Sequence, residues 1–265
     1  MRNISDSKVI ITTAGRTDQA LDRKAEQIAA KLGLPFACRN KRSVSVFLKE
    51  YENVLVVGKQ ALELYGRSSK EPYFFHPNLA MVRVKRLAAG KNDAFIDAAG
   101  LKKGDSLLDC TLGFASDSIA ASFVVGETGR VTGIEGSRIL SYMAETGLRS
   151  WEGQFPEMEA SMRRIEVVAS NHYEYLLACP DKSVDVVYFD PMFEEGIEES
   201  TAMRTISGFA VFTDINEDII TEAKRVARRK VVMKDHFRSK KFTELGFDQQ
   251  IRKSAKFHYG IISVE

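Results

Sequence analysis

The sequence predicts an α/β fold: a doubly wound, mostly parallel seven-stranded sheet of Rossmann-like type with an antiparallel C-terminal hairpin, preceded by a small N-terminal α/β unit. Two observations predict this fold. The period of the apolar residues alternates along the chain between two, typical of strands, and 3.6, typical of helices. The last two predicted strands are joined by too few residues for a crossover helix, so they are expected to pair antiparallel. A chain of 265 residues, 44% of them hydrophobic, can bury such a core.

Composition and periodicity divide the chain into three segments. They predict a small N-terminal unit at residues 1–66, a linker or cofactor-covering segment at 67–90, and a main domain at 91–265. The predicted elements of the N-terminal unit are strands at 9–13, 36 and 54–58 and helices at 18–32 and 43–50. This unit has no converging acids, so we expect it to position a substrate. Its basic stretch RNKR, residues 39–42, is a candidate contact for phosphate.

The main domain is predicted to alternate strands and helices. The strands are expected at 106–109, 130–135, 165–169, 185–190, 230–234, 247–252 and 259–264, and the helices at 118–125, 138–145, 173–177 and 216–226. Such alternation gives a parallel sheet covered on both faces, and ligands bind beyond the carboxyl ends of its strands. The residues that follow each strand are therefore the candidates for function.

Several classes of protein are excluded by composition. No apolar run reaches about 18 residues, and the apolar patch near the start is too short for a signal peptide, so no membrane partner is expected. Cys38, Cys110 and Cys179 lie far apart, with no CxxC pair and no neighbouring histidine at metal-ligand spacing. These features predict a reduced cytoplasmic protein without a disulfide framework or a metal site.

Charge is distributed unevenly. Residues 204–256 contain thirteen Lys or Arg against seven Asp or Glu, and a second basic cluster comprises Arg83, Lys85, Arg86 and Lys91. Solvated helix faces explain either cluster alone. The two basic clusters flank the fourth predicted strand of the main domain, residues 185–190, which is the candidate active strand. Together they favour a polyanionic partner.

The first strand of the main domain ends in the loop DCTLGFASD, residues 109–117. Gly113 lets the backbone pass close to a ligand, and Ser116 or Asp117 is placed to cap the following helix. The dinucleotide fingerprint GxGxxG, whose glycines make room for a pyrophosphate, is absent. Asp109 suits a cationic group of a ligand and would repel a phosphate. The alternative is an ordinary capped turn between a strand and a helix.

The next two strands also end on polar side chains. Glu135, followed by Gly136 and Ser137, is placed to accept both hydrogens of a ribose diol. Asn171 follows the third strand, where its amide can recognise an adenine edge, whereas His172 is more readily structural than catalytic. Acid, glycine, acid and amide on three consecutive strand ends fit S-adenosylmethionine better than NAD.

The fourth strand runs into VVYFDPMF, residues 186–193. With the loop at 109–117, Glu135 and Asn171, this motif resembles class I S-adenosylmethionine-dependent methyltransferases. It most resembles the bacterial 16S ribosomal RNA guanine-N2 methyltransferases, with a loop D-x-T-x-G-x-x-x-D and a catalytic strand Y-L-D-P-M-[FY]. The resemblance covers about residues 80–265. The cofactor-binding residues that it implies are Asp109, Thr111, Gly113, Ser116, Asp117, Glu135, Gly136, Ser137, Asn171 and His172.

The resemblance implies a catalytic role for the second motif. An exocyclic amine of a base is a poor nucleophile because its lone pair is delocalised into the ring. The Asp190 carboxylate and the backbone carbonyl of Pro191 are expected to accept its N–H hydrogens, and proline holds the turn that carries them. Phe193 offers a face on which a flipped base stacks, worth on the order of 1–3 kcal/mol. Met192 stands where the broader [DN]-P-P-[FY] class has a second proline, so the identity of the base stays open.

Four residues are candidate substrate contacts: His76, Arg83, Met192 and Lys234. In methyltransferases of this shape the segment before the first central strand often covers the cofactor, so His76 or Arg83 would contact its carboxylate or the substrate. A hydrogen-bonded linker histidine is the alternative. The motif is followed directly by four acids, which would repel an RNA phosphate near them: Glu194, Glu195, Glu198 and Glu199.

The leading hypothesis is therefore an amino-methyltransferase that uses S-adenosylmethionine and acts on guanine in ribosomal RNA or a small-subunit particle. A methyltransferase for a small molecule or a protein is the first alternative, favoured by the acidic run. A non-catalytic RNA-binding protein that kept the fold is the second, and Asp190 argues against it. A nicotinamide oxidoreductase is disfavoured by the missing glycines.

Overall fold

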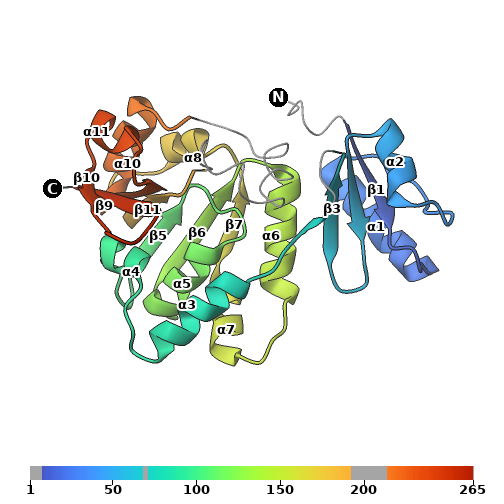
Figure 1. Cartoon of the computed structure of the whole chain (residues 1–265), viewed down its shortest axis with the longest axis horizontal. Coiled ribbons are helices and arrows are strands. Elements are labelled where there is room, and N and C mark those ends of the chain that lie inside the picture. Colours follow the sequence, from blue (N-terminus) through green and yellow to red (C-terminus); the bar gives the residue numbers. More distant parts are fainter. Residues whose placement is uncertain (1–7, 68–70, 192–213, 265) are drawn as a thin grey trace. The chain divides into compact units, whose positions relative to one another are not determined.

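The computed structural model describes residues 8–67, 71–191 and 214–264. Its contacts divide the chain into two compact units, coloured mainly blue and mainly green to red in Figure 1. The described residues of the first unit are 8–67 and 71–75, and those of the second are 76–191 and 214–264. Within these ranges no helix is both long and apolar enough to cross a membrane.

The first unit contains a four-stranded sheet in the order β1-β2-β3-β4. β1 (Val9–Thr13) pairs in parallel with β2 (Asn53–Val57). β2 pairs antiparallel with β3 (Leu62–Gly66), and β3 pairs antiparallel with β4 (Tyr73–Phe74). All five residues of β1 and of β2 are buried. Both strands are therefore buried along their whole length, as expected where a parallel pair lies inside a unit.

Two helices connect the parallel pair, α1 (Gln19–Leu32) and α2 (Val44–Glu50). Asp18 caps α1 by accepting a hydrogen bond from the backbone N–H of Leu21 at 2.9 Å. Gly33 ends the helix with φ of 64°, a left-handed conformation that glycine adopts without steric cost. The boundaries predicted for α1 from the sequence are thus explained by its two caps.

The second unit contains a seven-stranded sheet. Its strands are β5 (Ser106–Asp109), β6 (Arg130–Glu135), β7 (Glu166–Ala169), β8 (Val184–Phe189), β9 (Ala227–His236), β10 (Asp248–Gln250) and β11 (Phe257–Ser263). They lie in the order β10-β11-β9-β8-β5-β6-β7, in which β5 to β9 are parallel and β11 is antiparallel to both β9 and β10. This topology confirms the predicted fold class. The strand order reverses between β5 and β8, which places the expected ligand site beyond their carboxyl ends.

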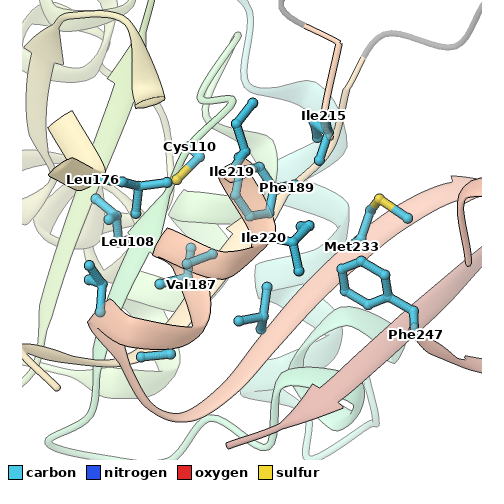
Figure 2. Packing of buried hydrophobic residues seen from close by; sticks show 14 of the residues in the cluster. Leu108, Cys110, Leu176, Val187, Phe189, Ile215, Ile219, Ile220, Met233 and Phe247 are labelled. Carbon is cyan, nitrogen blue, oxygen red and sulfur yellow. The ribbon is translucent and has the colours of Figure 1, made fainter. Parts of the chain in front are cut away.

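Helices cover both faces of this sheet. They are α3 (Asn78–Ala88), α4 (Ala94–Ala99), α5 (Ser116–Val125), α6 (Arg138–Ser150), α7 (Pro156–Arg164), α8 (His172–Ala178), α10 (Glu217–Val226) and α11 (Lys241–Glu244). On one face, Tyr188 of β8 packs against Phe95 of α4, with ring centroids 4.3 Å apart. On the other, Val187 and Phe189 belong to a buried cluster with Ile219 and Ile220 of α10 (Figure 2). Alternate residues of β8 therefore serve opposite cores, as the period of two requires.

Several elements differ from the sequence-based expectation. Six elements were not predicted from the sequence, namely β3, β4, α3, α4, α7 and α11, and two of them, β4 and α3, fall within the segment expected as a linker. The expected capping of α5 by Ser116 or Asp117 is wrong. Its N-cap residue is Ala115, with φ of 59° and no side-chain cap, because both polar side chains lie inside the first turn of the helix.

Candidate active site

The site is built where β5 and β8 end side by side. The backbone N–H of Cys110 donates to the carbonyl oxygen of Tyr188 at 2.9 Å, which continues the pairing beyond the last residue of β5. The backbone N–H of Asp190 donates to Oγ1 of Thr111 at 2.6 Å, and the Thr111 hydroxyl lies 3.5 Å from Oδ1 of Asp109. Thr111 therefore joins the two strand-end loops that the sequence assigns to cofactor and catalysis.

Asp109 is a buried carboxylate with two good donors. Its Oδ2 accepts from the Ser118 hydroxyl at 2.6 Å, and its Oδ1 accepts from the backbone N–H of Thr111 at 3.0 Å. Burial raises the pKa of Asp109 to about 7, although both hydrogen bonds oppose that rise, and the charges of Asp117 and Asp190 add to it. An additional positive charge nearby would favour the ionised form.

The loop after Asp109 is shaped by two glycines. Gly113 has φ of 49°, and a Cβ at this position would meet only the Thr111 carbonyl oxygen, 3.9 Å away. A Cβ on Gly133 of β6 would instead lie 2.3 Å from a methyl carbon of Leu112. Leu112 thus packs the loop down onto β6, while Gly113 leaves space beside the backbone for a ligand.

Glu135 ends β6 with its carboxylate among backbone N–H groups. Its Oε1 accepts from the N–H of Ser137 at 2.9 Å. Burial raises the pKa of Glu135, opposed by hydrogen bonds from the backbone of Ser137, Gly113 and Gly136. The Ser137 hydroxyl caps α6 by accepting from the N–H of Leu140 at 3.4 Å. The structure therefore brings Gly113 together with Glu135, Gly136 and Ser137, as the sequence analysis expected of neighbouring strand ends.

The residues after β7 are held by the start of α8. Oδ1 of Asn171 caps this helix, accepting from the N–H groups of Tyr173 at 2.8 Å and Glu174 at 3.3 Å. His172 is 9% exposed and packs edge-on against Phe189, with centroids 6.0 Å apart. Burial lowers the pKa of His172, which favours the neutral ring. The Asn171 oxygen predicted to recognise an adenine edge is thus also a structural cap.

Asp190 forms an ion pair with Lys234 of β9. Nζ of Lys234 lies 2.6 Å from Oδ2 of Asp190 and 3.6 Å from Oδ2 of Asp117. Burial raises the pKa of Asp190 to about 6; Lys234 opposes this rise and Asp117 adds to it. The Asp190 side chain is 23% exposed, so part of the carboxylate remains open to a ligand.

A second ion-pair cluster, formed by Arg83, Asp93 and Asp117, adjoins the Asp190–Lys234 pair through Asp117. The Arg83 guanidinium binds both oxygens of Asp93, at 2.7 and 2.8 Å, and donates to Oδ1 of Asp117 at 2.5 Å. The Tyr188 hydroxyl donates to Oδ2 of Asp117 at 3.1 Å. Arg83 and Asp117 therefore hold each other. Whether either also contacts the cofactor or the substrate stays a prediction.

Four predicted site residues remain to be located: His76, Pro191, Met192 and Phe193. His76 lies edge-on to Phe114 of the first loop, with ring centroids 5.6 Å apart. Pro191 follows Asp190 and is partly buried. Met192 and Phe193 lie outside the described residues, as does the acidic run that follows them: Glu194, Glu195, Glu198 and Glu199.

Three residues that shape the site had no role predicted from the sequence: Tyr188, Asp93 and Ser118. Tyr188 precedes the Phe189-Asp190 pair, and the alternation of strand side chains places it on the same face as Asp190. That spacing was a usable signal for Tyr188. Asp93 and Ser118 meet their partners through tertiary packing, for which no local pattern exists.

A doubly wound sheet with carboxylates beyond three of its strands, and no phosphate-binding glycines, is the arrangement of a Rossmann-like methyltransferase. The model of the family described as "Putative SAM-dependent methyltransferase" matches residues 39–258. The chain belongs to this family of S-adenosylmethionine-dependent methyltransferases. This finding confirms the resemblance, the enzyme class and the cofactor predicted from the sequence.

Individual relatives agree with that assignment. The chain is 46% identical over 254 residues to the uncharacterized protein YpiP of Bacillus subtilis, covering 96% of this chain and 98% of that protein. It is 28% identical over 218 residues to ribosomal RNA small subunit methyltransferase J of Alteromonas mediterranea, covering 78% and 79%. The match to the protein of the same name from Actinobacillus pleuropneumoniae covers 58% of this chain and 62% of that protein, at 29% identity.

A solved structure shows the same fold. The SAM-dependent methyltransferase of Neisseria gonorrhoeae superposes with a TM-score of 0.62 over 96% of this chain and 95% of that one, at 15% sequence identity. The arrangement of strands and helices is therefore shared with a methyltransferase of known structure.

The described residues fit the cofactor of this family. Asp109 is a buried carboxyl group that a cationic group would help to ionise, and Gly113 leaves open space beside it. Oγ of Ser116 and Nε2 of His172, at the starts of α5 and α8, are buried and have no hydrogen-bond partner in the described part of the chain. Buried polar atoms normally have a partner, so these two are expected to meet polar groups of a ligand.

The Arg83 cluster generates a prediction about stability. Arg83→Met should lower the free energy of unfolding by about 3–5 kcal/mol at pH 7, because it leaves the carboxylates of Asp93 and Asp117 buried without their partner. Ion pairing lowers the pKa of both acids despite their burial. Their stabilising effect is therefore present above the unfolded value of about 4 and is lost as the pH falls through the lower, folded values.

Urea unfolding of both proteins from pH 7 down to pH 3 measures this effect, and the gap between them should narrow below about pH 4. Arg149→Met is the matched control, since Arg149 is exposed and pairs with Glu145 at 3.6 Å. Equal losses in the two variants would contradict a supporting role for Arg83.

Proposed function

We propose that this enzyme methylates an exocyclic amine of a base in RNA, with N2 of guanine in small-subunit ribosomal RNA as the favoured acceptor. The observation that carries this proposal is the Asp190 carboxylate. It directly follows β8 at the point where the strand order reverses, it is partly open, and Lys234 holds it. The names of the relatives from Alteromonas and Actinobacillus support RNA as the substrate.

Each strand end binds a different part of S-adenosylmethionine. Glu135 accepts the hydrogens of the ribose diol, and Asp109 lies near a cationic group of the amino-acid part. The loop at Gly113 passes close to the ligand because no side chain fills that space. Asn171 and His172 border the adenine. The bound cofactor supplies an electrophilic methyl group.

Asp190 orients the amine of the base. Oδ2 of Asp190 is occupied by Lys234, which leaves Oδ1 to accept an N–H hydrogen of the amine. The Pro191 carbonyl is a second acceptor close by in the chain. Two acceptors on the N–H hydrogens turn the nitrogen lone pair toward the methyl group. Phe193 stacks on the base.

Lys234 keeps this carboxylate ionised. Without a cation at 2.6 Å, burial and the neighbouring Asp117 would drive the pKa of Asp190 further above its present value of about 6. The methylated amine must also lose a proton. A carboxylate whose pKa lies near the working pH accepts a proton readily and returns it to solvent.

The first unit is proposed to position the RNA. Arg39 is 9% exposed, and its Nε and Nη1 have no hydrogen-bond partner among the described residues. Arg39 and Arg42 both lie over the Phe47 ring, with guanidinium carbons 5.9 and 4.3 Å from its centroid. Burial lowers the pKa of Arg39, and Arg42 adds to this effect. Buried guanidinium groups usually have an anionic partner, and a phosphate of the RNA fits this requirement.

The cofactor assignment predicts the effect of Glu135. Glu135→Ala should weaken S-adenosylmethionine binding by about 1.5–3 kcal/mol, the scale of a lost hydrogen bond to a charged group. Titration calorimetry measures the change. Glu166→Ala is the control, because this acid begins β7 at the opposite edge of the sheet and pairs with Arg130. Unchanged cofactor affinity in Glu135→Ala would contradict the assignment.

The proposed function is tested by tritium transfer. Tritiated S-adenosylmethionine is offered with RNA from undermethylated small subunits, and with free bases, DNA and protein as parallel acceptors. Label should enter RNA and elute as N2-methylguanosine after digestion. Asp190→Ala should lower turnover at least about a hundredfold with cofactor affinity nearly unchanged, and Asp190→Asn less, since its amide oxygen still accepts one hydrogen. Label in protein or a small molecule alone, or wild-type turnover in Asp190→Ala, would refute the proposal.

The role of Lys234 predicts a pH profile. The kcat/KM of the wild-type enzyme should fall below about pH 6, where Asp190 becomes protonated. Lys234→Met removes the charge that stabilises the carboxylate, so this acidic limb should move to higher pH, and Lys234→Arg should keep it near the wild-type position. Lys230→Met is the control on the same strand, because Nζ of Lys230 binds the Ala98 carbonyl instead. An acidic limb that stays in place in Lys234→Met would show that the ion pair is only structural.

A further inference from the structure

An exposed aromatic ring surrounded by cations lies beyond the ends of β9 and β11. We call it the Phe237 patch and define it by five residues: Phe237, Arg238, Arg252, Lys253 and Lys256. Phe237 is 39% exposed, and all four cations of the patch are exposed. The nearby Ile251 is 78% exposed. Neither the cofactor site nor the catalytic strand uses any of these residues.

Strand register places the Phe237 patch at the same edge of the sheet as Asp190. Tyr259 of β11 lies opposite Lys234 of β9, and Phe257 lies opposite His236. The turn at 251–256 precedes β11, so it lies beyond the edge at which Lys234 binds Asp190. Phe237 is three residues past Lys234, about 10 Å along an extended chain. The patch therefore lies within a few nucleotides' reach of the catalytic carboxylate.

The ring of Phe237 is held by its surroundings. Its backbone N–H donates to the Lys256 carbonyl at 3.0 Å, and its carbonyl accepts from the Gln249 side chain at 2.9 Å. The rings of His236 and His258 lie 4.6 and 6.0 Å from it, and the Arg238 guanidinium lies 5.0 Å over its face. A fixed ring that keeps an exposed surface is suited to stacking, because little conformational freedom is lost when a second ring binds.

Three of the four cations in the patch have no acidic partner among the described residues. In the described part of the chain, Arg238, Arg252 and Lys253 form no ion pair. The nearby Asp235 is buried, and its carboxylate accepts from the backbone of His236 and from the hydroxyl of Ser239. Positive charge around an exposed aromatic ring is the arrangement with which proteins bind single-stranded nucleic acid.

We propose that the Phe237 patch binds the RNA strand next to the target base. A flanking base stacks on Phe237, and the phosphates around it are neutralised by Arg238, Arg252, Lys253 and Lys256. This inference rests on the proposed RNA substrate. It names the surface that holds the strand while the target amine is presented to Asp190.

The experiment uses the full chain and two probes, a fluorescein-labelled 12-nucleotide single-stranded RNA and transcribed small-subunit ribosomal RNA. Phe237→Ala should raise the Kd for both at least about tenfold, and Phe237→Trp should retain binding, as expected for stacking. Arg252→Gln and Lys253→Gln should each weaken binding and reduce the slope of log Kd against log salt by about one. In methylation assays, Phe237→Ala should raise KM for RNA and leave S-adenosylmethionine affinity unchanged.

Two variants serve as matched controls. Leu177→Ala removes a similarly exposed apolar side chain from α8, and Lys224→Gln removes an exposed cation from the last turn of α10, before β9 begins at the opposite edge. Both should bind RNA like the wild type. A comparable loss in these controls would show a nonspecific effect and overturn the assignment of the patch.

Other outcomes separate the patch from the proposed function. If the wild type methylates RNA while Phe237→Ala binds and methylates it equally well, the patch is refuted and the function stands. If Phe237→Ala binds naked RNA normally but loses affinity for the assembled small subunit, the surface contacts a protein and the proposal is wrong. If RNA binding depends on Phe237 but no methyl group is transferred to RNA, the patch stands and the proposed function fails.

Discussion

Four charges of alternating sign, one of them buried and three partly buried, form the interaction on which the site depends: Arg83, Asp117, Lys234 and Asp190. Their contacts are 2.5, 3.6 and 2.6 Å long in that order. Each charge alone would be costly to remove from water, and each is stable here because its neighbours have the opposite sign. The four residues come from α3, α5, β9 and the end of β8. The position of the Asp190 carboxylate, for which we propose the catalytic role, is therefore fixed by elements that are far apart in the sequence.

Thr111 connects this chain of charges to the cofactor side. Its hydroxyl accepts the N–H of Asp190 at 2.6 Å and lies 3.5 Å from Asp109. A displacement of the loop after β5 would consequently move the loop after β8. Because methyl transfer requires the donor and the acceptor to be aligned within a fraction of an ångström, a direct link between the two loops is of more use than two independently rigid ones.

The sequence was sufficient to predict those parts of the fold that local patterns determine. β6 was placed correctly because its buried run is bounded by polar residues, and α1 because Asp18 and Gly33 mark both ends. β3 and α4 were missed, since β3 follows β2 after a short turn and α4 has only six residues. The candidate roles of the strand-end acids were likewise predicted from their order along the chain. The pairing of Arg83 with Asp117, or of Lys234 with Asp190, depends on tertiary packing that no spacing reveals.

The balance of charge at the edge of the sheet explains why such a site suits a cationic cofactor. Burial raises the pKa of Asp109 and of Asp190, the negative charge of Asp117 adds to both rises, and Lys234 contacts both Asp117 and Asp190. Arg83 pairs with Asp93 as well as with Asp117, so its positive charge is already balanced in part by Asp93. Burial is the main cause of the pKa of about 7 for Asp109, and the negative charges of Asp117 and Asp190 add to it. A ligand that brings positive charge to Asp109 lowers this pKa and is bound more tightly for the same reason. An anionic pyrophosphate would raise it, so the electrostatics of the loop oppose a dinucleotide independently of its missing glycines.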